Sequence, residues 1–383
     1  MKSKLKVVRV VTIHECVPRY LKNTLERMPE DFDVCVIGQN VSRYRHDYPN
    51  VKWFDVDIKR NISLYSDIRA LVALIIIFLI YKPDIVHSVM PKSGLLSALA
   101  GFFCRVPVRI HTFTGQVWTN KVGFFRSLLY YLDRIVNNLN TICLTDGPAQ
   151  ALFLFENKIS KNGKPLRVLS KGTLSGINMN RFRLDVIGEK AEKLRKKLGV
   201  DASNVVFSYI ARKNRVKGAI DMLMAFSNVS KRFPNARLLF IGPDESEGEI
   251  NALIKINPSL LNNVVNIGVV SDHEIYLAIS NVNCLPSYRE GFSTITLEAA
   301  ALGVPTIGSN IPGLIDSIED GNTGILFPVG DLEKLTQAML SVLENPDKLM
   351  EMGQSAKRMV ESNFTADQLY DALKVLYFSS SIK

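Results

Sequence analysis

The amino-acid sequence is poor in cysteine, which excludes two kinds of structural site. It contains five cysteines in 383 residues, scattered along the chain and never in a CxxC arrangement. They are Cys16, Cys35, Cys104, Cys143 and Cys284. An odd number of isolated cysteines provides neither a disulfide framework nor a zinc site, and it is typical of a reducing compartment. We therefore expect a cytoplasmic protein.

Long uninterrupted hydrophobic runs are also lacking. The apolar residues behind the amino-terminal lysines are interrupted by Arg9 and end at Ile13, whereas a signal peptide needs a longer apolar stretch. The most apolar segment, LVALIIIFLI at 71–80, has about half the length needed to cross a bilayer. We interpret it as a helix buried in the core.

The composition is that of a folded protein with two domains. The chain is too long for one ordinary core, and its 47% of hydrophobic residues against 22% of charged residues supply enough material for two. The formal net charge of +10 at pH 7 favours anionic partners such as nucleotides, nucleic acid or acidic lipid headgroups. It does not choose between them.

Short apolar runs alternate with helical patterns along the whole chain, which indicates parallel sheets built from βαβ units. The expected strands are residues 6–13, 33–37, 84–89, 108–113, 141–144 and 167–170 in the first half, and 205–210, 237–241, 264–269, 282–286, 305–308 and 324–329 in the second. We expect two doubly wound, Rossmann-like α/β domains at 1–183 and 190–362, with a final helix at 363–383 that packs back on the first domain. Two such domains facing each other form a cleft at the carboxyl ends of their strands, where these sheets bind ligands.

The most informative segment is REGFSTITLEAA at 289–300, which follows an expected strand and opens a helix. Gly291 lets the backbone come close to a ligand. The backbone amides of Phe292, Ser293 and Thr294 are expected to be free donors at the helix N-terminus, where a diphosphate binds well.

Two glutamates accompany this loop. Glu290 lies in the loop itself, and Glu298 lies just over one turn into the helix. Both carboxylates can bind one elongated polar ligand. Glu298 would bind its ribose, and Glu290 would bind the hydroxyls of its sugar. The alternative is that both are solvated, as most surface carboxylates are. The strand, glycine loop and helix favour the ligand-binding interpretation.

A basic loop, ARKNRVKG at 211–218, follows the first expected strand of the second half. Phosphate sites of this architecture lie at that position, and fixed cations there stabilise the negative charge that develops on a diphosphate leaving group. We assign this role to Arg212 and Lys217. Lys213 and Arg215 are expected to be solvated, as the residues of most charge runs are.

Both segments resemble the retaining GT-B glycosyltransferases of glycosyltransferase family 4. Glu290 and Glu298 are separated by seven residues in EGFSTITLEAAALGVPTIGS, like the E-x7-E motif of that family, and Arg212 and Lys217 match its Arg-x4-Lys-Gly pattern. The continuation IPGLIDSIEDGNTGILFPVGD is also similar to family members. The resemblance covers roughly the whole chain.

The resemblance implies an activity and a role for each motif residue. It implies that Glu290 contacts the donor sugar, that Glu298 binds the nucleotide ribose, and that configuration is retained while the leaving phosphate accepts the acceptor's proton. Glu290, Arg212 and Lys217 are then the catalytic residues. The donor substrate is expected to be a nucleotide-sugar, namely a UDP-sugar that carries an N-acetylated sugar. No further cofactor is expected.

The first half of the chain is expected to hold the acceptor. HTFTGQVW at 111–118 resembles the branch of the family that acts on N-acetylated sugars and lipid-linked glycans in surface-polysaccharide synthesis, that is, lipopolysaccharide O-antigen or capsule. The expected acceptor is a polyprenyl-diphosphate-linked glycan or an oligosaccharide. Many family members have a His–Gly pair where this chain has Thr114 and Gly115, so no histidine role is carried over. The acceptor-side candidates are His14, His87, Lys92, Thr114, Gly115 and Gln116. For His87, the alternative is a packed core histidine.

Asp55 and Asp57 form a D-x-D sequence like that of metal-dependent glycosyltransferases. That motif belongs to a different fold, GT-A, where it holds a divalent ion near the diphosphate. We interpret it here as a solvated strand end, because the cations of the second domain can take the place of the ion. No metal is expected.

A basic and aromatic segment, KVGFFRSLLYY at 121–131, can lie in a lipid interface. The alternative is a helix whose apolar face packs in the core. Because a lipid-linked acceptor and a positive net charge both favour lipid contact, we expect peripheral association with anionic lipid on the inner face of the cytoplasmic membrane.

Three other functions are weaker interpretations. A nucleotide-sugar epimerase can share the two-domain architecture, but it needs acid–base groups that face C2 of the sugar. An NAD-dependent oxidoreductase is disfavoured, because no G-x-G-x-x-G follows the first expected strand of either half. Nucleic acid is not an expected partner, since the lysines and arginines are dispersed rather than arranged in a stripe.

Overall fold

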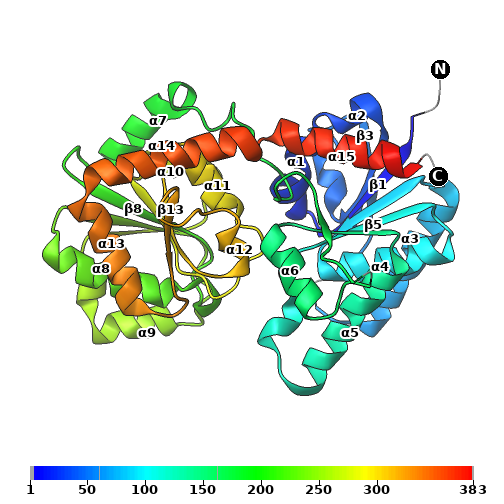
Figure 1. The fold of residues 1–383 in the computed structure, drawn as a ribbon, viewed down its shortest axis with the longest axis horizontal. Helices are drawn as coiled ribbons and strands as arrows, with labels where there is room; N and C mark the ends of the chain where they lie inside the picture. The colour runs from blue at the N-terminus through cyan, green and yellow to red at the C-terminus, as the bar shows by residue number, and fades with distance from the viewer. Residues whose placement is uncertain (1–3, 60, 162, 382–383) are drawn as a thin grey trace. The chain divides into compact units, whose positions relative to one another are not determined.

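The computed structural model describes residues 4–59, 61–161 and 163–381 and divides the chain into two compact units. Unit 1 comprises Met1–Gly176 and Ala366–Lys383, and unit 2 comprises Ile177–Thr365. Each unit is a parallel sheet with helices on both faces (Figure 1). Residues 177–183, which the sequence analysis placed at the end of the first domain, lie in unit 2.

The sheet of unit 1 has, within the described residues, seven parallel strands in the order β3-β2-β1-β4-β5-β6-β7. The strands are β1 (Lys6–Ile13), β2 (Asp33–Gln39), β3 (Val51–Asp55), β4 (Ile85–Val89), β5 (Val108–Phe113), β6 (Ile142–Thr145) and β7 (Arg167–Val168). The chain order reverses beside β1, which makes the sheet doubly wound and places its ligand crevice at the carboxyl ends of the strands. The sequence analysis interpreted Asp55 and Asp57 as a strand end but did not include β3 among the expected strands. This strand lies at the sheet edge with only Val51 buried, so it lacks a continuous apolar run.

Helices cover both faces of this sheet. One face carries α3 (Leu64–Tyr81), α4 (Pro91–Phe103) and α5 (Gly123–Leu139), and the other carries α1 (Lys22–Leu25), α2 (Met28–Asp31) and α15 (Ala366–Ser381) (Figure 1). The remaining helical segments of unit 1 are η1 (Val17–Leu21), η2 (Val41–Tyr44), η3 (Val117–Asn120) and α6 (Pro148–Glu156).

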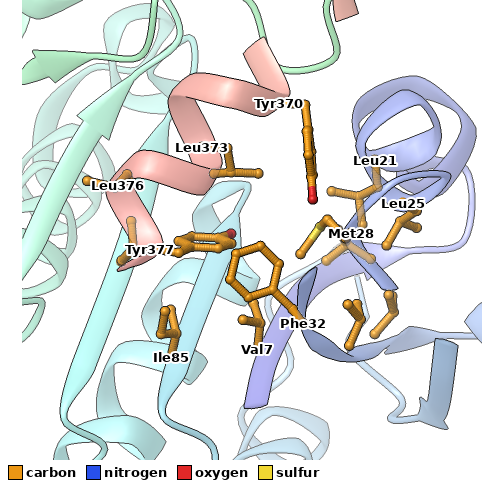
Figure 2. Close-up of a cluster of buried hydrophobic side chains, with 14 of the residues drawn as sticks. Val7, Leu21, Leu25, Met28, Phe32, Ile85, Tyr370, Leu373, Leu376 and Tyr377 are labelled. Atoms are coloured by element: carbon orange, nitrogen blue, oxygen red, sulfur yellow. The ribbon is translucent and has the colours of Figure 1, made fainter. Parts of the chain in front are cut away.

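The C-terminal helix α15 is part of the core of unit 1. Figure 2 shows Tyr370, Leu373 and Tyr377 pointing from α15 toward side chains of β1, β4 and the residue that precedes β2. These positions recur at three- and four-residue intervals, so they form one face of the helix. Tyr377 is fully buried and its hydroxyl lies 2.7 Å from Nδ1 of His87 in β4, which fixes the helix on the sheet with a polar contact as well as an apolar one.

The helix α3 is longer and more exposed than the sequence analysis expected. It has 18 residues, and within the part of the chain that the structure describes it is the one helix long and apolar enough to cross a membrane by length and composition. The interpretation of 71–80 as a buried segment was wrong, because only Ala70, Leu74 and Phe78 of α3 are buried. The helix packs on one face of the sheet with its other side exposed to solvent, so only one stripe of its surface is buried in the core.

The sheet of unit 2 has, within its described residues, six parallel strands in the order β10-β9-β8-β11-β12-β13. They are β8 (Val205–Ile210), β9 (Ala236–Ile241), β10 (Val264–Ile267), β11 (Val282–Leu285), β12 (Thr306–Ser309) and β13 (Gly324–Phe327). One face carries α8 (Ala219–Arg232), α9 (Glu249–Ile256) and α13 (Leu332–Glu344). The other carries α7 (Leu184–Lys197), α10 (His273–Ala278), α11 (Thr294–Ala301) and α14 (Pro346–Asn363). Shorter segments are η4 (Arg215–Lys217), η5 (Pro258–Leu261) and α12 (Pro312–Ile315).

Candidate active site

The basic loop that follows β8 is held in place by the side chain of Tyr209 and by the close approach of Gly218 to the neighbouring loop. The hydroxyl of buried Tyr209 lies 2.9 Å from the carbonyl oxygen of Arg212 and 3.1 Å from that of Lys217. Gly218 ends the loop with a φ of +66°, and a Cβ there would collide with the carbonyl of Pro286 after the adjacent strand β11. Only glycine satisfies both conditions, so this residue brings the loops after β8 and β11 together.

The close approach of these loops places Lys217 beside Glu290. Nζ of Lys217 lies 2.5 Å from Oε2 of Glu290, and the two side chains are only 16% and 13% exposed. The other oxygen of Glu290 accepts a hydrogen bond of 2.7 Å from Oγ of Ser287. A cation and a carboxylate, both largely shielded from water, therefore meet at the carboxyl ends of neighbouring strands.

Arg212 lies at the same end of the sheet in a more exposed network. Its Nη1 donates to Oε2 of Glu245 at 3.0 Å, and both side chains are more than a third exposed. Asn214 connects this pair to Lys217, because its Nδ2 donates to the same oxygen of Glu245 at 3.1 Å and its Oδ1 accepts the backbone N–H of Lys217 at 3.0 Å. The two cations predicted from the sequence thus belong to one connected loop structure.

The other two cations of the loop behave differently from each other. Arg215 is solvated as expected, with a side chain 77% exposed beside Glu249. Lys213 is buried, and the prediction that it is solvated was wrong. Its Nζ donates to Oδ1 of Asn266 at 2.6 Å and to the carbonyl of Ile267 at 2.7 Å. Burial lowers the pKa of Lys213, and the lysine ties the basic loop to β10 instead of facing a ligand.

Glu298 is paired with a histidine that the sequence analysis did not select. Its Oε2 lies 3.0 Å from Nε2 of His273 at the start of α10, and the two side chains are 15% and 23% exposed. Burial opposes protonation of His273, but the hydrogen bond and negative charge of Glu298 outweigh it, and the pKa of His273 is raised. Arg181 pairs nearby with Glu274 at 2.7 Å. Glu298 thus belongs to a half-buried charged cluster.

The glycine loop before α11 agrees only in part with the prediction that its backbone amides are free donors. The N–H of Ser293 donates to the carbonyl of Gly313 at 3.2 Å, so it is not the free donor expected from the sequence. Among the described residues, Oγ of Ser293 is one of the buried polar atoms without a hydrogen-bond partner. Thr294 begins α11, and the first turn of a helix leaves its N–H groups without partners inside the helix. A Cβ on Gly313 would collide with Glu290 and Gly291, so the loop after β12 packs closely on the acidic loop.

The two histidines of the central strands in unit 1 are structural. His87 is buried, with Nδ1 2.7 Å from the hydroxyl of Tyr377 and Nε2 2.8 Å from Oγ1 of Thr112. Burial lowers its pKa well below the ordinary value, and both ring nitrogens are engaged inside the unit. The structure therefore shows the packed-histidine alternative for His87. His111 is also buried, with Nδ1 3.0 Å from Oγ of Ser88, and burial lowers its pKa to about 3.

The other acceptor-side candidates follow different strands of this sheet. His14 follows β1 and has a quarter of its side chain exposed. Lys92 is largely buried, with Nζ 2.7 Å from Asp67 and in contact with the carbonyl of Asn61. It therefore joins α4 to the beginning of α3.

The segment after β5 is compact. Thr114 and Gly115 are half-buried, and the buried Gln116 donates from Nε2 to the carbonyl of Thr114 at 2.6 Å. Nε1 of buried Trp118 donates to Asp133 at 2.8 Å.

The two carboxylates of the D-x-D sequence hold local structure. Asp55 accepts hydrogen bonds from the backbone N–H and the hydroxyl of Ser42, and Asp57 accepts one from Nε2 of Gln39 at 2.8 Å. Asp55 is the last residue of β3, the edge strand of unit 1, and Asp57 lies two residues beyond it. Both carboxylates therefore have hydrogen-bond partners within unit 1.

The residues that sequence reasoning missed are the partners of the predicted ones. They are Tyr209, Glu245, Ser287, His273 and Gly313. Glu245, His273 and Gly313 meet their partners through the packing of neighbouring segments. Tyr209 and Ser287 contact residues that are nearby in the sequence, without forming a recognisable motif. The single available signal was their position at or beyond the carboxyl ends of expected strands, where doubly wound sheets bind ligands.

Comparison with known proteins finds a matching protein family. Residues 190–359 match the protein family described as glycosyl transferases group 1. This segment contains the basic loop, the acidic loop and the helix that carries Glu298.

Two curated relatives and one solved structure are similar over nearly the whole chain. The capsular polysaccharide biosynthesis glycosyltransferase CapM of Staphylococcus aureus is 28% identical over 97% of this chain and 96% of its own. The UDP-Gal:alpha-D-GlcNAc-diphosphoundecaprenol alpha-1,3-galactosyltransferase of Escherichia coli is 25% identical over 98% and 97%. The sucrose-phosphate synthase of Thermosynechococcus elongatus has the same fold, with a TM-score of 0.80 at 18% identity over 98% and 99% of the two chains.

The relatives indicate the class of chemistry, and the structural neighbour indicates the fold of the two Rossmann-like units. Residues 190–359 match the glycosyl transferases group 1 family, and the protein is a glycosyltransferase with the two-domain GT-B fold.

Proposed function

We propose that this glycosyltransferase moves a sugar from a nucleotide diphosphate, with retention of configuration, to a lipid-linked or polysaccharide acceptor in bacterial cell-surface glycan synthesis. The pair formed by Lys217 and Glu290 is the observation that carries the proposal. It puts a cation suited to a diphosphate beside a carboxylate suited to sugar hydroxyls, at the strand ends where such sheets bind ligands.

The donor is a UDP-sugar that carries an N-acetylated sugar and binds to unit 2. Arg212 and Lys217 bind its diphosphate together with the amides at the start of α11, and Glu298 binds its ribose. Glu290 binds the sugar. The name of the Escherichia coli relative, which includes both a UDP-sugar and a diphosphoundecaprenol acceptor, supports this choice of donor and of a polyprenyl-diphosphate-linked acceptor.

The transfer exchanges one bond at the anomeric carbon for another. The bond from C1 to the β-phosphate oxygen breaks, and a bond from C1 to the acceptor oxygen forms on the same face of the sugar. The proton of the acceptor hydroxyl passes to the leaving phosphate. Arg212 and Lys217 stabilise the negative charge that grows on that phosphate in the transition state. The two cations thereby take the role that a divalent metal ion has in metal-dependent transferases.

The acceptor binds to unit 1 near the half-buried Thr114 and Gly115. The helix α5 begins close by in sequence and exposes Phe124 and Phe125, 76% and 60% respectively, next to the exposed cation Arg126. This arrangement suits shallow contact with anionic lipid, and we place the protein on the inner face of the cytoplasmic membrane.

A thermal-shift panel tests the donor site. The purified protein and its Glu298→Ala variant are heated with UDP, GDP, ADP, NAD and a set of UDP-sugars. Because a ligand that binds the folded state raises the melting temperature by mass action, we expect a shift with UDP and with one UDP-sugar that is lost in the variant. A shift with NAD alone, or with none of these compounds, contradicts the proposal.

Retention and metal independence are tested on the product. The anomeric configuration of the transferred sugar is read by proton NMR from the coupling at C1, and it should equal that of the donor. Inversion would contradict the mechanism. Transfer should continue in the presence of EDTA, and epimerised donor formed without acceptor would instead identify an epimerase.

A further inference from the structure

The outer side of α3 is an apolar stripe without cover in the described structure of unit 1. Its exposed side chains recur mostly at four-residue intervals, which places them on one side of a helix. They are Leu64, Tyr65, Ile68, Val72, Ile76, Leu79 and Ile80, with exposed fractions from 49% at Val72 to 78% at Ile80. The buried stripe of Ala70, Leu74 and Phe78 lies on the opposite side. A helix with a second apolar stripe opposite its buried one leaves that stripe exposed to water, and an exposed apolar patch of this kind marks an interaction site.

The stripe continues onto the neighbouring helix α4. Phe102 and Phe103 at its C-terminal end are 52% and 65% exposed. The two helices lie side by side on the sheet (Figure 1), and Sγ of Cys104 is 3.6 Å from the carbonyl of Ile75. We call the exposed apolar residues of α3 together with Phe102 and Phe103 the α3–α4 face.

Three cations lie on or directly after the two helices of the α3–α4 face. Arg69, Lys82 and Arg105 are exposed on α3, at its C-terminal cap and just after α4. The sequences of both helices contain a single acidic residue, Asp67, and Lys92 neutralises it at 2.7 Å. An apolar centre with a cationic rim complements a bilayer surface that carries anionic headgroups.

We propose that the α3–α4 face is a membrane-docking surface that lies in the interface of an anionic lipid bilayer, with α3 in the plane of the membrane. Self-association through this face is disfavoured by charge, because it would bring two cationic rims together in a chain with a net charge of +10. An anionic bilayer avoids this repulsion, because its headgroups attract the cationic rim, and it also covers the apolar side chains. The face is distinct from the aromatic start of α5.

Docking through this face would deepen the proposed function. Its consequence for acceptor binding rests on that proposed function, in which the acceptor is lipid-linked. The helices α3 and α4 each begin at the carboxyl-end side of the strands, because a helix between parallel strands runs back across the sheet. Lys92 joins those two beginnings through Asp67 and the carbonyl of Asn61. The face therefore brings the strand-end loops of unit 1, where a lipid-linked acceptor is proposed to bind, next to the membrane.

Co-sedimentation of the full chain with vesicles tests the proposal. Vesicles of phosphatidylglycerol and phosphatidylethanolamine are compared with vesicles of phosphatidylcholine, at low and at high salt. The test variant is Ile76→Ser/Ile80→Ser, and the matched control is Ile256→Ser/Val269→Ser in unit 2, where the replaced side chains are 83% and 78% exposed. Both variants replace exposed residues, so both are expected to fold. A third variant, Phe124→Ser/Phe125→Ser, reports on α5 separately.

The wild type and the unit 2 control should sediment with the anionic vesicles, and the α3 variant should lose about tenfold or more of its partition coefficient. High salt should weaken the wild-type binding. Equal binding of the α3 variant and the control, loss confined to the α5 variant, or no binding to anionic vesicles at low salt would overturn the proposal. A stable dimer in light scattering that the α3 variant abolishes would assign the face to a second copy instead.

A UDP thermal shift measured on the same preparations separates this proposal from the proposed function. The α3 variant should keep the wild-type shift. If the wild type shows no shift with any nucleotide but sediments through α3, the proposed function fails and the docking surface stands.

Discussion

Nζ of Lys217 lies 2.5 Å from Oε2 of Glu290, and neither side chain is more than 16% exposed. The two residues are far apart in the sequence, and they meet because β8 and β11 are neighbours in the sheet. Without a donor, each charge compensates the other at low exposure, where an unpaired charge is costly. A bound diphosphate would give Lys217 a second anionic partner without leaving Glu290 unpaired.

Replacing Lys217 by Ala should abolish most of the transfer activity. The variant lacks the cation assigned to the leaving diphosphate, and loss of one such group typically lowers kcat by about 10²–10³. Steady-state kinetics with the donor found in the thermal-shift panel measures the effect. Arg215→Ala, in the same loop but with a side chain 77% exposed, is the matched control and should retain activity within about threefold. Similar losses in both variants would show that the loop acts only through its net charge.

Gly218→Ala should destabilise unit 2 and weaken nucleotide binding. The new Cβ would meet the carbonyl of Pro286 at a positive φ, so the loops after β8 and β11 have to separate. We expect a loss of about 3 kcal/mol or more in the free energy of unfolding, measured by chemical denaturation. Gly248 also has a positive φ, but open space surrounds its Cβ position. Gly248→Ala should therefore cost only about 1 kcal/mol, and an equal cost at both positions would refute the argument from close approach.

The pair of His273 and Glu298 should make stability depend on pH. The folded pKa of His273 is raised above its ordinary value of 6.5, so the pair contributes fully below about pH 6.5, and the contribution is lost as the pH rises through the folded pKa. Glu298→Gln removes the charge of the partner. The difference in unfolding free energy between wild type and variant should therefore be larger at pH 6 than at pH 9, by about 1–2 kcal/mol. A difference that does not change with pH would show that His273 is not charged in the pair.

Asp133 should make unit 1 less stable as the pH rises, whereas a carboxylate whose pKa is lowered on folding makes a protein more stable as the pH rises. Burial raises its pKa to about 7 from 3.8, although the hydrogen bond from Trp118 opposes the shift. Between pH 4 and pH 7 the folded state binds more protons than the unfolded state, so stability falls as the pH rises through this window. Asp133→Asn can keep an acceptor for Trp118 and remove the titration. It should be more stable than wild type at pH 8, by about 2–4 kcal/mol, and the advantage should shrink toward pH 5 in thermal melts.

The strands that the sequence predicted best are the central ones. β1, β5 and β8 have the predicted bounds, because both faces of a central parallel strand are buried and the residues form a continuous apolar run. β3 lacks that signal, since it lies at an edge with one buried residue. The start of α11 was equally predictable, because a segment that begins a helix leaves a local pattern.

The side-chain partners could not be read in the same way. Lys213 and Arg215 are two residues apart and look alike in the sequence, yet one is buried against β10 and the other is solvated. The difference depends on which way each side chain leaves the loop and on what the neighbouring strand presents there. The α3 helix shows the same limit, since its composition does not reveal that only one of its sides meets the sheet.

The sequence by itself determined the two α/β domains and most of their strands, because these features depend on local periodicity, and its motifs singled out Glu290, Glu298, Arg212 and Lys217 as candidate site residues. The tertiary structure alone decided which charges meet, which histidines are buried and which apolar side of α3 stays exposed. Those outcomes depend on contacts between segments distant in the chain, and a pairing of strands such as β8 with β11 carries information that no single segment contains.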